Sequence, residues 1–161
     1  MAETNYSERG YDPDSSSVAK ANGKFVFDRE TAEAEFERYC EANDIDCDID
    51  GMSDEDRKGF EPIKKRFVKA CMQGRVKVNG TELIYTVSDF SPSPFRGEEV
   101  AIKRSGGKSF MEMDNYKETQ SIRKMNGFMS AMTGKEPIFF AKIDGKDWLF
   151  FKDIATLFLV D

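Results

Sequence analysis

The fold class of this chain is decided by residues 76–87, which read VKVNGTELIYTV. β-Branched and aromatic residues are typical of strands, and an Asn-Gly pair between two such runs favours a two-residue type I′ turn. With Asn79 and Gly80 as the loop, Lys77 is predicted to lie opposite Glu82 as a favourable cross-strand charge pair. A third short strand is predicted at Val100-Ala101-Ile102, beyond a loop with two prolines and a glycine at 91–97.

Helical patterns precede the hairpin. Asp28 and Ser53 stand immediately before apolar residues at helical spacing, so each is predicted to be the N-cap of a helix. Pro62 interrupts the second pattern and predicts a kink or a restart there. Gly74 is a suitable residue to end that helix.

Helical patterns also follow the hairpin. Asn115 and Glu118 fit a capping box for a helix that ends at Gly134, and Asp144 is predicted to cap a last, aromatic helix. Residues 137–143 form an apolar connector of ambiguous type. The predicted fold is therefore α+β, with N-terminal helices, a central β-hairpin with a third strand, and C-terminal helices.

The predicted organisation is a polar, flexible tail at 1–24 followed by a single α+β domain at 25–161. Within that domain we expect an acidic and basic helical part at 25–74, a hairpin part at 75–104 and a helical part at 110–161. A chain of 161 residues can bury a hydrophobic core that is stable without disulfide bonds or a structural metal.

Charge is distributed unevenly along the chain. The net charge is −6, which argues against general nucleic-acid binding. Residues 28–57 hold 13 acidic and 3 basic residues, whereas residues 58–78 hold 1 acidic and 7 basic residues. These two segments either attract each other or face different partners.

The complete absence of histidine excludes Ser-His-Asp and Cys-His catalysis and every histidine-ligated metal or haem. The cysteines are Cys40, Cys47 and Cys71, an odd number without a C-x-x-C pair, so reduced, largely buried thiols are expected. No apolar run approaches a membrane span and no signal peptide is recognisable. We therefore expect a cytoplasmic protein without enzymatic activity, cofactor or membrane contact.

Two motifs resemble ligand sites only in part. Asp46, Asp48, Asp50 and Gly51 match the opening of an EF-hand loop, but Arg57 occupies the position of the bidentate glutamate. A solvated acidic linker is the preferred interpretation. The loop at 103–108, KRSGGK, lacks the first glycine of a phosphate loop and is interpreted as a flexible basic turn.

Methionine and aromatic residues gather in the last third of the chain. Such stripes usually mark a core, but clustered methionine also forms adaptable binding surfaces. A helix with apolar groups on more than one face can bury one of them and offer another to a partner. The predicted partner-binding residues are Met125, Phe128, Met129, Met132, Trp148 and Phe151.

Three short motifs carry a family resemblance: FMEMD at 110–114, FMSAMTG at 128–134 and IDGKDW at 143–148. With the LIYTV strand at 83–87 and the terminal IATLFL at 154–159, they make residues 83–161 resemble the tail assembly chaperones of long-tailed bacteriophages. The acidic N-terminal half departs from that pattern.

The resemblance implies a non-enzymatic role in the host cytoplasm. Proteins of this family bind the long apolar tape measure protein, keep it soluble, help recruit tail tube subunits and leave the finished tail. Homo-oligomerisation stays open. One alternative is an acidic phage-encoded inhibitor or nucleic-acid mimic that blocks a host protein, supported by the acidic run from Glu33 to Asp56. A further alternative is a structural component that remains in the virion.

Overall fold

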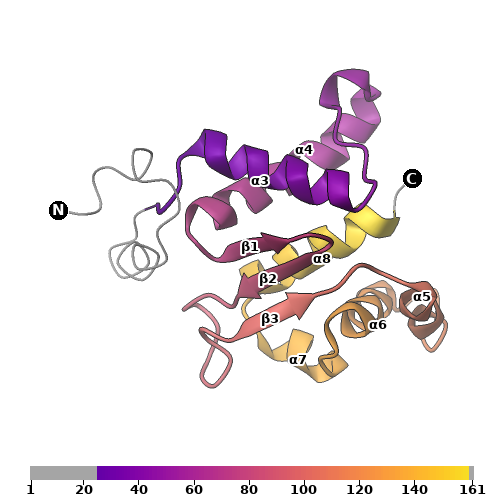
Figure 1. The fold of residues 1–161 in the computed structure, drawn as a ribbon. Coiled ribbons are helices and arrows are strands. Elements are labelled where there is room, and N and C mark those ends of the chain that lie inside the picture. The colour runs from indigo at the N-terminus through magenta and orange to yellow at the C-terminus, as the bar shows by residue number, and fades with distance from the viewer. Residues whose placement is uncertain (1–24, 160–161) are drawn as a thin grey trace. The chain divides into compact units, whose positions relative to one another are not determined.

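The computed structural model describes residues 25–159, and the predicted tail at 1–24 lies outside them. Helices and a three-stranded antiparallel sheet make up these residues (Figure 1), which confirms the predicted α+β class. The chain divides into two compact units that meet in the sequence between Ile84 and Tyr85. Whether these two units together form the single domain predicted at 25–161 stays a prediction.

The sheet contains β1 (Val76–Asn79), β2 (Glu82–Thr86) and β3 (Glu99–Ile102), in the order β1-β2-β3. The predicted hairpin and third strand are confirmed, but the predicted type I′ turn is wrong. Gly80 and Thr81 form the two-residue turn, and Gly80 has a φ of +63°. A two-residue turn with glycine at its first central position requires a positive φ at that residue alone. Asn79 therefore keeps its strand conformation. Lys77 therefore does not lie opposite Glu82.

In the first unit, α3 (Arg29–Ala42) and α4 (Asp54–Met72) frame a single 3-10 turn, η2 (Ile49–Gly51). Both predicted caps are confirmed. Asp28 accepts the backbone N–H of Thr31 at 2.8 Å, and the Ser53 hydroxyl accepts that of Asp56 at 3.2 Å.

The second helix of this unit runs through Pro62 without a break, so the predicted restart is wrong, while the alternative of a kink stays a prediction. Proline cannot donate to the carbonyl four residues earlier, which belongs to Lys58. Both residues are exposed, so water can satisfy that carbonyl. Gly74, with a φ of +76°, ends the helix as predicted.

Aromatic rings make up much of the core between α3 and α4. Phe36 meets Phe60 and Phe67 edge-on, with ring centroids 5.7 and 4.9 Å apart, and Tyr39 lies 5.8 Å from Phe67. These contacts lock the two helices together through their apolar faces. The predicted burial of the thiols is confirmed for Cys40 and Cys71, whereas Cys47 is partly exposed.

The second unit has four helices after β3: α5 (Gly107–Met113), α6 (Ser121–Thr133), α7 (Pro137–Lys142) and α8 (Gly145–Leu159). The predicted capping box at Asn115 is wrong, because α6 begins six residues later and the preceding residues form α5 and a turn. Gly134 ends α6 with a φ of +74°, as predicted. Asp144 accepts the N–H of Lys146 at 2.9 Å, which confirms it as a cap of α8.

The core of the second unit is centred on Phe151 of α8. Its ring makes edge-on contacts with Tyr85, Phe140 and Phe139, at centroid distances of 5.2, 5.4 and 6.1 Å. The ring of Phe150 stacks on Tyr85 at 4.1 Å. None of the helices within residues 25–159 combines the length and the apolar character that a bilayer crossing requires.

Candidate functional site

Most of the predicted partner-binding residues lie in the core. Phe128, Met129, Met132 and Phe151 are almost completely buried, so they cannot contact a partner in this conformation. Met125 and Trp148 are partly exposed, and the Trp148 indole N–H donates to the side-chain oxygen of Asn126 at 2.7 Å. A docking role for the six residues stays a prediction, and only these two reach the surface.

Other large apolar side chains of the second unit face solvent. Met111 of α5 is 70% exposed, Ile122 of α6 61% and Phe110 of α5 47%. We call these three the α5–α6 apolar residues. Phe90 and Ile138 are also exposed, in the loop after β2 and on α7.

Helix α5 is held closely against α6. A Cβ added at Gly127 would lie 3.0 Å from the Tyr116 ring and 3.2 Å from the carbonyl oxygen of Glu112. The ring of Phe110 meets buried Phe128 edge-on at 5.1 Å. Periodicity in the sequence does not distinguish exposed apolar side chains such as Met111 and Ile122 from buried ones.

A completely buried carboxylate, Asp147, lies in the first turn of α8. Its oxygens accept the Tyr85 hydroxyl at 2.6 Å, the Ser88 N–H at 3.0 Å, the Ser88 hydroxyl at 2.8 Å and the Ser91 hydroxyl at 2.5 Å. The Ser91 oxygen also accepts the N–H of Asp144 at 2.8 Å. We call this set the Asp147 network. Because four donors occupy the carboxylate, it ties β2 and its following loop to α8.

The thiols are poor nucleophiles. Burial raises the pKa of Cys71 to about 12 and raises that of Cys40 further, and burial also raises the pKa of the partly exposed Cys47. A raised pKa leaves little thiolate near neutral pH, and thiolate is the reactive form.

The acidic loop between α3 and α4 and the first turn of α4 present their carboxylates to solvent. The exposed acidic residues are Asp44, Asp46, Asp48, Asp50, Asp54, Glu55 and Asp56. The N–H of Asp48 donates to the carboxylate of Asp46 at 3.0 Å. Within residues 25–159, no three His, Cys, Asp or Glu side chains gather as a metal site would require.

Basic residues of α4 and of the loop at 103–108 lie beside acidic or aromatic side chains of the same unit. Lys58, Lys64 and Lys65 line a shallow hollow of about 680 Å³ together with Arg29, and acidic Glu33 and Glu61 share it. In the loop before α5, the Arg104 guanidinium lies 5.7 Å from the centroid of the Phe158 ring.

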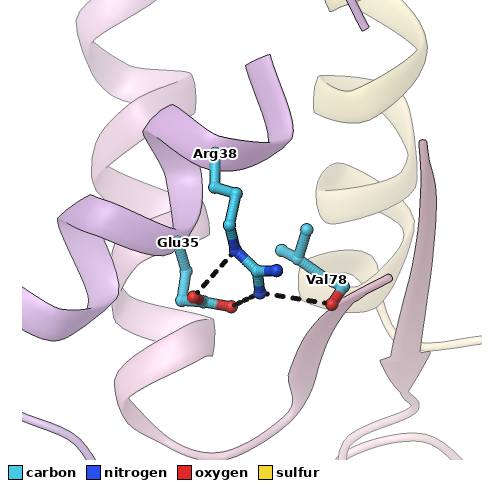
Figure 2. Close-up of polar contacts among 3 residues, drawn as sticks. All are labelled: Glu35, Arg38 and Val78. Atoms are coloured by element: carbon cyan, nitrogen blue, oxygen red, sulfur yellow. Dashed lines mark hydrogen bonds and ion pairs between the residues drawn. The ribbon is translucent and has the colours of Figure 1, made fainter. Parts of the chain in front are cut away.

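A more enclosed cavity, of about 350 Å³, lies between α3 and β1, and we call it the α3–β1 groove. Its lining consists of Phe27, Thr31, Glu35, Arg38, Cys71, Gly74, Val76, Lys77 and Val78. Figure 2 shows Arg38 reaching from α3 to both Glu35 and the strand. Its Nη2 lies 2.6 Å from Glu35 Oε2 and donates to the Val78 carbonyl at 3.4 Å. Hydrogen bonding to Glu35 raises the pKa of Arg38, which stays charged.

Comparison of the chain with protein-family models, with curated proteins and with solved structures finds no match.

Proposed function

We propose that this chain is a non-catalytic binding protein of the kind that its C-terminal half resembles, a phage tail assembly chaperone. It would hold the apolar tape measure protein in the host cytoplasm until tail tube subunits assemble around it. The observation that carries the proposal is the exposure of Phe110, Met111 and Ile122 on two helices of one unit.

Large apolar side chains in solvent support a binding role, because contact with a partner removes their surface from water. Methionine adapts to different shapes at little cost, which suits a client that offers many similar apolar segments. Two of these three residues lie on α5, which packs closely against α6. The predicted docking residues Met125 and Trp148 lie in the same unit and remain partly exposed.

The described side chains also support a role without covalent chemistry. Raised pKa values keep the three thiols protonated. The carboxylate of Asp147 is completely buried in the first turn of α8. It already accepts four hydrogen bonds from residues of its own unit. Such a carboxylate has no free oxygen lone pair aimed at a substrate and acts as a structural tie.

The test is co-purification with a co-expressed tape measure protein. We expect wild-type protein to retain that client and the double variant Met111→Asp, Ile122→Asp to lose it. Ile138→Asp, a matched apolar-to-acidic change on α7, serves as the control and should retain the client.

Two results would contradict the proposal at different levels. A folded double variant that still retains the client would exclude the α5–α6 apolar residues as the docking surface. Failure of the wild-type chain to associate with the tape measure protein or any other tail component would exclude the chaperone function itself.

One observation favours a second candidate, an acidic inhibitor or nucleic-acid mimic. Seven carboxylates between Asp44 and Asp56 face solvent, and such a surface attracts a basic partner by long-range electrostatics. Binding of that kind weakens steeply with salt and should disappear when Asp44, Asp46, Asp48 and Asp50 are changed to Asn. Salt-insensitive binding to an apolar client would support the chaperone instead.

A further inference from the structure

We propose that the α3–β1 groove binds an extended peptide segment of another protein, which adds to the sheet as a strand beside β1. The geometry points to a segment that alternates apolar and acidic residues. This site lies in the first unit and is independent of the α5–α6 apolar residues and of the function proposed for them.

The backbone of β1 is available for such pairing. Within the described part of the chain, β1 is at the edge of the sheet and has β2 as its strand neighbour. Because Gly80 and Thr81 form the turn, Asn79 and Glu82 close the hairpin as a hydrogen-bonded pair. Pairing alternates along the strand, so the N–H and C=O groups of Val76 and Val78 point away from β2.

Arg38 provides independent support for this orientation. Its guanidinium donates to the carbonyl of Val78 at 3.4 Å from the α3 side (Figure 2), so that carbonyl faces the groove. The contact is long and lies on an exposed side chain, 57% accessible. An incoming backbone N–H can therefore replace it with little loss.

The size and lining of the groove favour a strand with short apolar side chains. A volume of about 350 Å³ accommodates one or two side chains and is too small for a helix. Phe27, Cys71 and Val76 supply apolar surface, and Val76 and Val78 lie on one face of β1. Partner residues on the same face, spaced by two, would contact that surface.

The charge of the groove indicates which residues of the partner strand alternate with its apolar residues. Lys77 is exposed, lies on the opposite face of β1 from its valine neighbours, and forms no ion pair with any residue at 25–159. Glu35 is already neutralised by Arg38. The groove therefore carries an excess positive charge on a chain of net charge −6, which complements a carboxylate on the partner.

The experiment uses the full chain, labelled with ¹⁵N, and an N-acetylated, C-amidated hexapeptide that alternates Val and Asp. The matched probe replaces each Asp with Lys. We expect the acidic peptide to shift the amide signals of Val76–Val78 and to slow hydrogen exchange at Val76 and Val78. The lysine peptide should bind at least about tenfold more weakly, because it places like charges together.

Two variants separate the backbone and charge contributions. Lys77→Glu should weaken binding about three- to tenfold, whereas Lys58→Glu, the same change at an exposed lysine outside the groove, should leave it unchanged. Val78→Pro removes the outward N–H at an edge position that tolerates proline and should abolish the exchange protection. Its thermal unfolding confirms that the protein is folded.

Several outcomes would overturn the proposal. One is the absence of shifts at β1 with the acidic peptide at millimolar concentration. Another is equal binding of the acidic and lysine peptides, or an equal effect of Lys58→Glu and Lys77→Glu. Octanoate serves as a small-molecule probe. If it shifts the groove signals while the peptide leaves β1 exchange unprotected, the groove is a site for small anionic amphiphiles and not for a strand.

Discussion

The two compact units differ in what they expose to solvent. The first places an acidic loop at its surface and buries Phe36, Tyr39, Phe60 and Phe67, and Phe25 is its one exposed large apolar side chain among the described residues. The second buries about half of its aromatic rings and leaves five large apolar side chains exposed, namely Phe90, Phe110, Met111, Ile122 and Ile138. We therefore expect the first unit to attract partners by salt-sensitive electrostatics and the second to bind them through apolar contact.

The largest expected effect comes from the core of the second unit. Phe128→Ala should lower the free energy of unfolding by about 4 kcal/mol, because it leaves a cavity beneath Phe110. Phe90→Ala, at an exposed position in the same unit, should change it by less than about 0.5 kcal/mol. Urea unfolding measures both. Equal effects would show that burial of Phe128 contributes no more to stability than the exposed ring of Phe90.

Removal of the buried carboxylate should rank second. Asp147→Ala leaves the Tyr85, Ser88 and Ser91 donors without their acceptor, and we expect a loss of about 3 kcal/mol. Asp144→Ala, which removes the partly exposed cap just before the same helix, should cost about 1 kcal/mol. Thermal unfolding of the two variants distinguishes them, and a smaller loss for Asp147→Ala would show that the network contributes little.

Alkaline pH should affect the first unit selectively. All three cysteines lie before Ile84, and burial raises the pKa of Cys71 to about 12. A raised pKa in the folded state means that the unfolded chain releases the proton first. The stability contribution is therefore complete below the unfolded pKa and is lost as pH rises from about 9 toward 12.

We expect a slope of about 1 kcal/mol per pH unit from this thiol, and Cys71→Ala should show a flatter dependence. Hydrogen exchange at amides of α4 and of α8 follows the two units separately. An identical alkaline response of the variant and the wild type would exclude the thiol as the cause.

The smallest effect is expected at the acidic loop. Changing Asp44, Asp46, Asp48 and Asp50 together to Asn should alter the free energy of unfolding by less than about 0.5 kcal/mol, because these carboxylates face solvent. The same variant should abolish any salt-dependent binding. A large destabilisation in circular-dichroism melts would assign the loop a structural role and weaken the contrast between the units.

Local features were predictable from the sequence because neighbouring residues determine them. Asp28 and Ser53 act as caps, and Gly74 and Gly134 end helices, at the positions that capping chemistry requires. The turn type was not predictable in the same way. Gly80 fits either position of a two-residue turn, and the choice depends on pairing along both strands.

Tertiary features escaped sequence reasoning for a different reason. The periodicity through Phe128, Met129 and Met132 identifies the apolar face of a helix, but a core and a docking surface produce the same pattern. The Asp147 network joins residues 56 to 62 positions apart, so no local spacing indicates it. Exposure of Met111 and Ile122 depends equally on which neighbours cover them.

The close approach at Gly127 has a consequence for how the apolar surface of the second unit could be tuned. Because a hydrogen atom stands where Tyr116 and the Glu112 backbone leave no room, the distance between α5 and α6 is set by the smallest side chain available. Each carbon added at this position would act as a wedge and lift α5 away from Phe128. A substitution at position 127 would therefore change how much apolar surface of α5 is exposed to water, without altering any residue of α5 itself.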